Sequence, residues 1–302
     1  MEARLDRRHF LLSSGVAAVG AAALSARQTG AAEPLQRKTP SRLKLGCCAY
    51  SFRQYLSGKE RTMSLEDFIG LCAEWGLDGA ELTSYYFDAQ TPEYCHRLRR
   101  ACFLAGLDVS AGAVGNSFAV PPGEARQKQV ALVSQWVDLA TEMGAPCLRV
   151  FGGAVPKDTA PEQATTWAIE ALQEAQVHAG ERGVFLALEN HGGVTATADG
   201  VLAILKAVSS EWVGANLDTG NFRTEDPYAE MARVAPYAVN VHLKTAVQPQ
   251  GKPAAPADFA RIAQILREAG YSGYLSLEYE AKEDPKTAVP RLVSEIREAV
   301  GR

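Results

Sequence analysis

Short apolar runs recur along the chain from Leu43 onward, and each is too short for a helix of ordinary length. Eight such runs read as strands: Leu43–Tyr50, Gly79–Leu82, Leu107–Ala113, Cys147–Phe151, Val184–Leu188, Val213–Leu217, Val239–Leu243 and Tyr274–Leu277. Between them lie amphipathic stretches such as SLEDFIGLCAEWG and DFARIAQILREAG. Several of these stretches end at glycines typical of helix C-caps: Gly76, Gly144, Gly180 and Gly270. The pattern therefore predicts strands that alternate with helices.

Strand and helix alternation of this kind predicts parallel strands joined by crossover helices. Eight units within residues 41–302 match the size of a closed (β/α)8 TIM barrel, which needs roughly 250 residues. An open doubly wound sheet is the alternative, but no GxGxxG motif follows the first strand. We therefore expect one α/β domain, a (β/α)8 barrel over residues 41–302.

The first 34 residues have the pattern of an export signal. Arg7 and Arg8 stand in DRRHFLL, an Ala/Gly/Val/Leu run follows to about Leu24, and Ala31 and Ala32 supply small residues near a cleavage point. Residues 1–34 are thus predicted to be a twin-arginine type signal peptide, and the mature protein to be periplasmic. The alternative is a retained anchor, but the apolar run is shorter than the ~20 residues that span a bilayer. We expect no stable membrane insertion after cleavage.

Composition narrows the class of partner. The chain is 47% hydrophobic and 22% charged, enough to bury a sizeable core, and its net charge of −4 gives no nucleic-acid footprint. The six cysteines include no CxxC pair and read as small core residues, which argues against a thiolate zinc site. We expect a small-molecule partner and leave a homo-oligomer open.

Candidate chemistry collects at four successive strand ends. The segments LALENHGG, GANLDTGNF, VNVHLKTA and LSLEYEA each place one metal-competent side chain after an apolar run: Glu189, Asp218, His242 and Glu278. Reactive groups in TIM barrels gather at the C-terminal ends of strands. Three carboxylates and one imidazole form an oxygen-rich site that suits Mn²⁺ or Mg²⁺, with Co²⁺ or Fe²⁺ also compatible.

These strand-end motifs resemble the xylose isomerase-like TIM-barrel superfamily of sugar phosphate isomerases and epimerases. The resemblance runs from KLGCCAYSFR to GYSGYLSLEYE. In the ketose 3-epimerases of that superfamily, a Glu, Asp, His and Glu in this strand order hold one divalent ion, usually Mn²⁺. The resemblance implies the same ligand roles for Glu189, Asp218, His242 and Glu278, and it makes the two glutamates the acid/base pair.

The chemistry of such a site can be stated from the residue types. Removing a proton beside a carbonyl leaves an enediolate, whose negative charge a divalent cation stabilises. Glu189 and Glu278 could remove and return that proton from opposite faces of the carbon. We therefore expect a metal-dependent sugar isomerase or epimerase. A 3-keto-glycoside lyase that works by β-elimination is the alternative, and a non-catalytic carbohydrate-binding barrel is a third reading from another class.

Further polar and aromatic residues are candidates for substrate contact. His191 and Lys244 each follow a predicted ligand by two residues, with a hydrogen-bonded loop histidine and a carboxylate-paired lysine as alternatives. Glu81 ends the second strand and is expected to face the mouth and contact substrate, with a salt bridge as the alternative. Tyr50 and Phe52 could form an apolar wall for a sugar ring, unless they pack against neighbouring helices.

The sixth strand departs from the epimerase pattern. Where the ketose 3-epimerases carry Asp-x-x-His, with the His on the substrate, this chain reads Asp218-Thr219-Gly220-Asn221. Asn221 can form a hydrogen bond to substrate but cannot shuttle a proton. The seventh-strand loop, HLKTAVQPQGKP, contains no arginine, so we expect an unphosphorylated sugar or keto-sugar.

Overall fold

A computed structural model describes residues 33–59 and 61–301. Within them, eight parallel strands close into a barrel in the order β1-β10-β7-β6-β5-β4-β3-β2, which confirms the predicted fold. Its strands are β1 (Leu43–Cys48), β2 (Gly79–Thr83), β3 (Asp108–Ala113), β4 (Cys147–Phe151), β5 (Phe185–Glu189), β6 (Val213–Asp218), β7 (Ala238–Leu243) and β10 (Gly273–Leu277). The predicted signal over residues 1–34 lies outside the described residues, apart from its last two, and stays a prediction.

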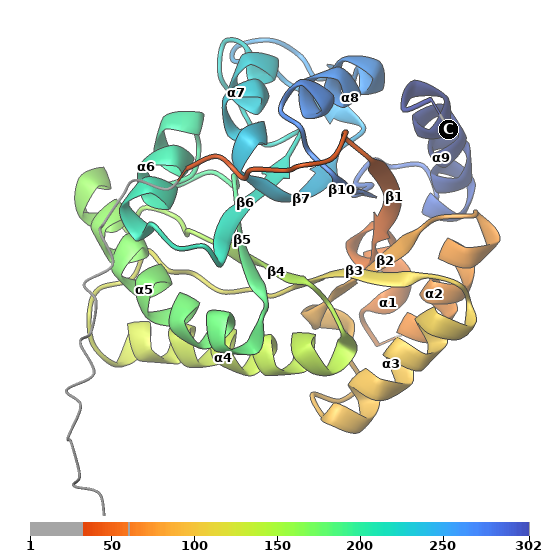
Figure 1. Cartoon of the computed structure of the whole chain (residues 1–302), viewed down its shortest axis with the longest axis horizontal. Helices are drawn as coiled ribbons and strands as arrows, with labels where there is room; N and C mark the ends of the chain where they lie inside the picture. Colours follow the sequence, from red (N-terminus) through yellow and green to blue (C-terminus); the bar gives the residue numbers. More distant parts are fainter. Residues whose placement is uncertain (1–32, 60, 302) are drawn as a thin grey trace, which may run out of the picture.

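The helices surround the barrel (Figure 1). They are α1 (Arg53–Leu56), α2 (Leu65–Glu74), α3 (Pro92–Leu104), α4 (Glu124–Met143), α5 (Pro161–Arg182), α6 (Ala198–Val208), α7 (Pro227–Val234), α8 (Phe259–Glu268) and α9 (Pro285–Ala299). A short antiparallel pair, β8 (Ala246–Val247) and β9 (Ala255–Pro256), lies in the loop after β7. None of the helices in the described residues is long and apolar enough to cross a membrane.

Helix α5 shows how the sequence sets the packing between the outer layer and the barrel. Its buried face is made almost wholly of small side chains: Ala164, Ala168, Ala171, Leu172, Ala175 and Ala179. Small residues at this spacing fall on one helix face and let the helix approach its neighbours closely. The opposite face is mostly polar and exposed, so the period of the sequence sets the orientation of the helix.

One predicted helix end is wrong by three residues. Gly180 lies inside α5, and the helix ends instead at Gly183, whose φ of 69° is the left-handed C-cap conformation. A Cβ atom on Gly180 would come within 2.7 Å of Cδ1 of Trp212, so this glycine makes room for an aromatic ring. The expected glycine caps at Gly76, Gly144 and Gly270 all have positive φ.

The segment 33–42 runs across the N-terminal end of the barrel, where it passes over β7 and β10 (Figure 1). The Leu35 amide donates to the carbonyl of Pro236 at 3.0 Å. Arg37 donates to the carbonyl of Ala238 at 2.8 Å and lies over the buried ring of Tyr271. This end of the barrel is therefore covered, and the strand ends with the candidate chemistry lie at the other.

Candidate functional site

The predicted quartet comes from four neighbouring strands. Glu189 ends β5, Asp218 ends β6, His242 is the penultimate residue of β7 and Glu278 follows β10, and these strands are adjacent in the barrel. Asp218 and His242 are paired in the β6–β7 register, so they reach the same level. None of the four is more than 7% exposed. The fold therefore brings the four side chains together at the C-terminal end of the barrel.

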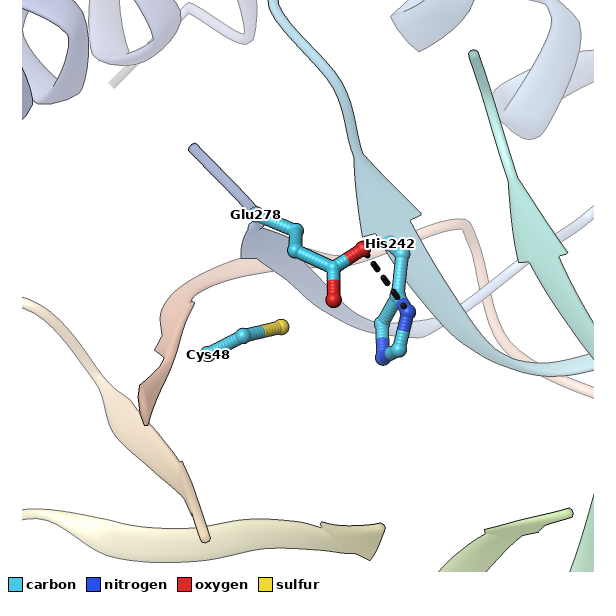
Figure 2. A group of neighbouring side chains, drawn as sticks. All are labelled: Cys48, His242 and Glu278. Carbon is cyan, nitrogen blue, oxygen red and sulfur yellow. Dashed lines mark ion pairs between the residues drawn. The ribbon is translucent and has the colours of Figure 1, made fainter. Parts of the chain in front are cut away.

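The imidazole of His242 lies at the centre of this group. Its Nδ1 atom is 3.6 Å from Oε2 of Glu189 and 3.6 Å from Oε2 of Glu278. Glu189, Asp218 and His242 each offer a ligand atom within 4.8 Å of the other two. Figure 2 shows the carboxylate of Glu278 facing the histidine ring. His242 is therefore the residue around which the other three side chains gather.

Glu81 lies beneath His242 and does not reach the open mouth of the barrel. Its Oε1 atom is 2.6 Å from Nε2 of His242, and its Oε2 accepts a hydrogen bond from Asn240 at 3.0 Å. Its side chain is almost fully buried. The expectation that Glu81 contacts substrate does not match this position. A carboxylate on the far nitrogen of a metal-binding histidine instead fixes the tautomer and the ring orientation.

Lys244 is paired with carboxylates, as the alternative interpretation of this residue expected. Its Nζ is 2.5 Å from Oε2 of Glu278 and 3.5 Å from Oδ2 of Asp218, and it also pairs with Glu280. A Cβ atom on Gly220 would come within 2.6 Å of the Lys244 side chain. Gly220, two residues after Asp218, therefore leaves room for the Lys244 side chain to reach the site.

Arg149 belongs to the site and was missed by the sequence analysis. It lies in β4, is 4% exposed, and places Nε 3.2 Å from Oε2 of Glu189. Its guanidinium lies 3.9 Å from the centre of the Phe151 ring and donates to the carbonyl of Val114 at 3.2 Å. The sequence feature that points to Arg149 is a single arginine inside the apolar strand CLRVF. A buried charge there requires a charged partner.

Buried carboxylates and cations are concentrated in this group of residues. Four buried carboxylates, Glu81, Glu189, Asp218 and Glu278, lie beside the permanent cations Arg149 and Lys244. Burial alone would lower the pKa of His242, but the carboxylates of Glu81 and Glu278 raise it to about 10, so the imidazolium joins Arg149 and Lys244 in balancing these carboxylates. Within the described chain, Oδ2 of Asp218 and Nδ1 of His242 are buried atoms without a hydrogen bond. Among the described residues, Oδ2 of Asp218 has only its ion pair with Lys244 at 3.5 Å.

The two glutamates lie in opposite electrostatic surroundings. Burial raises the pKa of Glu189 to about 8, although Arg149 and His242 act in the other direction. Burial alone would also raise the pKa of Glu278, but His242 and Lys244 hold it down at about 2. The surroundings therefore favour the protonated form of Glu189 and the ionised form of Glu278.

The remaining predicted substrate residues take different positions. Asn221 donates from Nδ2 to Oε1 of Glu189 at 3.2 Å. His191 is exposed beside the site, with its ring 4.5 Å from that of Phe151. Tyr50 is half-buried. Phe52 does not form a wall of the site, because it is fully buried and packs against the rings of Phe68 and Trp75.

A pocket of about 210 Å³ opens beside Lys244 and Glu278. Its other lining residues are Gly220, Asn221, Arg223, Thr245, Ala246, Glu280 and Ala281. Pockets for drug-sized ligands run from roughly 300 Å³ upward, so this one suits a smaller molecule. Arg223, which follows β6, brings an arginine to the site that a search of the seventh-strand loop alone does not find.

Comparison with known proteins identifies the family. Residues 69–299 match the family of xylose isomerase-like TIM barrels. The chain belongs to this family. No curated protein is similar enough in sequence to count as a match.

Solved structures of the xylose isomerase-like barrels resemble this chain over nearly their whole length. A D-psicose 3-epimerase determined in the presence of D-fructose has 16% identity and a TM-score of 0.70, covering 85% of this chain and 97% of its own. A 3-keto-D-glucoside 4-epimerase from E. coli has 14% identity, a TM-score of 0.68 and coverage of 85% and 99%. A probable 3-DHS dehydratase from Bacillus anthracis has 16% identity, a TM-score of 0.64 and coverage of 86% and 98%. At these identities the likeness establishes the fold.

Proposed function

We propose that the protein is a divalent-metal-dependent sugar isomerase or epimerase that moves a proton on a carbon beside a carbonyl. The observation that carries this proposal is the placement of Glu189 and Glu278. One oxygen of each lies 3.6 Å from the same nitrogen of His242, so the two carboxylates approach a common point from β5 and β10. A substrate carbon held beside an ion at that point could lose its proton to one carboxylate and regain a proton from the other.

The residues that would hold the ion are Glu189, Asp218, His242 through Nδ1, and Glu278, a hard donor set that favours Mn²⁺. When bound, a divalent cation supplies positive charge that stabilises negative charge developing on substrate oxygens beside the reacting carbon. Glu81 orients His242 from below.

The carboxylate of Glu189 is held at both of its oxygens. Arg149 lies 3.2 Å from Oε2 and Asn221 donates to Oε1 at 3.2 Å. A carboxylate fixed at both ends keeps one orientation, which matters for a group that must meet a particular C–H bond. This supports a positioning role for Arg149 and Asn221 in the proposed proton transfer.

The substrate we propose is an unphosphorylated sugar or keto-sugar. The pocket beside Glu278 is small, and its lining includes Asn221, Lys244 and Arg223, whose side chains carry donors for hydroxyl or carbonyl oxygens. His191 and Tyr50 stay candidates for substrate contact. The solved relatives named for their action on D-psicose and on a 3-keto-D-glucoside support this substrate class.

A second candidate is elimination from a 3-keto-glycoside, and the position of Lys244 favours it. Its ammonium group lies 2.5 Å from the carboxylate of Glu278, so a proton donor stands directly beside a proton acceptor. Loss of a glycosidic group from the neighbouring carbon needs such a donor for the leaving oxygen. Both reactions begin with the same proton abstraction.

The decisive experiment incubates the Mn²⁺-loaded protein with free ketoses and 3-keto-glycosides in D₂O and follows the products by NMR. We expect deuterium to replace hydrogen on the carbon beside the carbonyl of one substrate class, together with an epimer or isomer. An unsaturated product with release of the aglycone would assign the lyase instead. Binding of a sugar without exchange would overturn both and leave a carbohydrate-binding barrel. Elemental analysis that finds no divalent metal in exchanging protein would remove the ion from the mechanism.

A further inference from the structure

Cys48 is the one chemically reactive side chain near His242 that the proposed reaction does not use. It is the last residue of β1 and is 1% exposed. Cys48, His242 and Glu278 each offer a ligand atom within 4.8 Å of the other two. Figure 2 shows the thiol pointing toward the space between the Glu278 carboxylate and the histidine ring. From its sequence context alone, this cysteine is expected to be a small core residue.

The three side chains are close to the geometry of a tetrahedral ion site. Ligands bound at 2.0 to 2.3 Å with tetrahedral angles lie roughly 3.5 Å apart, so shifts of about 1 Å would complete the site. The thiol of Cys48 is held only by a long contact of 3.8 Å to the carbonyl of Ser276. Nδ1 of His242 is buried without a hydrogen bond. Neither group would lose a strong partner by binding an ion.

The neighbouring cysteine provides an internal comparison. Successive strand residues point to opposite faces, so Cys47 and Cys48 face different surroundings. The thiol of Cys47 lies 3.6 Å from Oγ of Ser51 and belongs to the hydrophobic core. It is not part of either group of candidate ligands found in the described residues. The two cysteines are equally buried but differ in their access to His242.

We propose that Cys48, His242 and Glu278 form a binding site for one thiophilic divalent cation of the Zn²⁺ or Cd²⁺ class. The site overlaps the proposed Mn²⁺ site, and the proposal rests on that function only through the shared His242 and Glu278. A Cys, a His and a Glu with one open position are a donor set typical of zinc. Because two ions cannot share two ligands here, a thiophilic ion and Mn²⁺ exclude one another.

In the proposed binding step, the cation replaces the thiol proton of Cys48. Binding breaks the S–H bond of Cys48, forms a metal–sulfur bond and releases the proton to solvent, with no change in oxidation state. Only a cation with high affinity for sulfur can displace the proton of this buried thiol. A hard ion such as Mn²⁺ gains little from sulfur and stays on the oxygen donors.

The test uses the full mature chain, reduced and freed of metal by a chelator, and titrated with Cd²⁺. We expect a thiolate-to-metal charge-transfer absorption that saturates at one Cd²⁺ per chain, and loss of that absorption in Cys48→Ser. Cys47→Ser is the matched control and should keep it. The Cd²⁺ dissociation constant should rise about tenfold or more in Cys48→Ser, while Mn²⁺ affinity, read from the paramagnetic resonance of free Mn²⁺, stays within about twofold.

Three outcomes would overturn the inference: no charge-transfer absorption in the parent protein, the same absorption in Cys48→Ser, or simultaneous binding of Mn²⁺ and Cd²⁺. Circular dichroism and Mn²⁺ binding establish that Cys48→Ser is folded, and Cys48→Ala replaces it if it is not. A parent that binds Mn²⁺ but gives no thiolate absorption removes only this site. A parent that binds Cd²⁺ through Cys48 but never Mn²⁺ removes the proposed metal-dependent reaction and leaves this site in place.

Discussion

Glu189 and Glu278 are the same residue type at two strand ends, but different neighbours hold them. Glu189 forms an ion pair with Arg149 and a hydrogen bond with Asn221, whereas Glu278 forms an ion pair with Lys244 and lies beside His242. Surroundings that separate the charge states of two carboxylates are how one site supplies both an acid and a base. At the scale of single residues, the division of roles is therefore set by what each carboxylate contacts.

Converting either glutamate to glutamine tests their role in proton transfer. Glu189→Gln and Glu278→Gln keep the shape and one ligand oxygen but remove the base, so turnover should fall by ~10³ or more while metal binding weakens modestly. Asp218→Asn should act mainly through the ion, and excess Mn²⁺ should partly restore its activity. Deuterium exchange at saturating Mn²⁺ is the measurement. If both glutamine variants exchange at the parent rate, the base must be sought at His191 or Lys244.

Replacing Lys244 tests whether its ammonium competes with the ion for carboxylates. Lys244 bridges Asp218 and Glu278, two proposed ligands. Removing its charge in Lys244→Met leaves those carboxylates uncompensated, so the chelated variant should unfold at a lower temperature than the parent. Mn²⁺ affinity should rise by about tenfold or more, because a like charge has been removed at close range. Calorimetric titration with Mn²⁺ gives the affinity, and unchanged or weaker binding would contradict the prediction.

At the scale of elements, the tips of β5 and β6 are fastened to each other. Asn190 donates to the carbonyl of Asp218 at 2.9 Å and accepts from its amide at 2.8 Å. An asparagine that bonds both ways across two strands imitates a further step of the sheet ladder. The proposed ligands Glu189 and Asp218 thus stand on a rigid edge, which favours precise placement of side chains.

Helix α2 offers an element-scale test of pH dependence. Asp67 accepts hydrogen bonds from the amide and hydroxyl of Ser64 at 2.8 and 2.7 Å, and these bonds lower its pKa. A lowered pKa stabilises the folded state above the unfolded pKa of about 4, and the contribution is lost as the pH falls through the folded pKa. Asp67→Asn should therefore lower the free energy of unfolding at pH 7, by about 0.5 kcal/mol.

Urea unfolding at pH 7 and at pH 3 measures the effect. The difference between Asp67→Asn and the parent should narrow at the lower pH, because the parent carboxylate is then losing its charge. Glu74→Gln is the control, since it removes an exposed carboxylate from the other end of α2. A difference for Asp67→Asn that is the same at both pH values would show that the capping bonds, and not the charge, are responsible.

At the scale of the whole molecule, the two ends of the barrel differ in what lies over them. The segment 33–42 covers the N-terminal end through Leu35 and Arg37, and the buried carboxylates occupy the C-terminal end. The chain that leads into the barrel therefore joins it at the face opposite the candidate site.

We propose that the protein is exported by the twin-arginine route, on the strength of Arg7 and Arg8 ahead of an apolar run. Changing both to lysine should leave the precursor in the cytoplasm, because the arginine pair is the element that the translocase reads. Fractionation and immunoblotting of the parent and variant give the measurement. Mature protein outside the inner membrane in a strain without that translocase would show that the assignment is wrong.

The barrel could be predicted from the sequence. Short apolar runs and amphipathic stretches indicate which residues are buried, and each can be recognised within a short segment of chain. The same local pattern placed Asp218 and His242 at strand ends, where β6 and β7 then pair them directly. A polar residue at the end of a buried strand can therefore be recognised from the sequence alone.

The directions of the other side chains depend on how the strands pair in the folded barrel. The register between β2 and β3 shifts between Ala80 and Glu81, and the carboxylate of Glu81 meets His242, 161 residues later. Arg149 finds Glu189 across the β4–β5 pairing, and Phe52 turns into the core on a short helix after β1. These outcomes depend on strand register and closure of the barrel, which bring distant residues together. A pattern read along one stretch of chain contains no information about that partner.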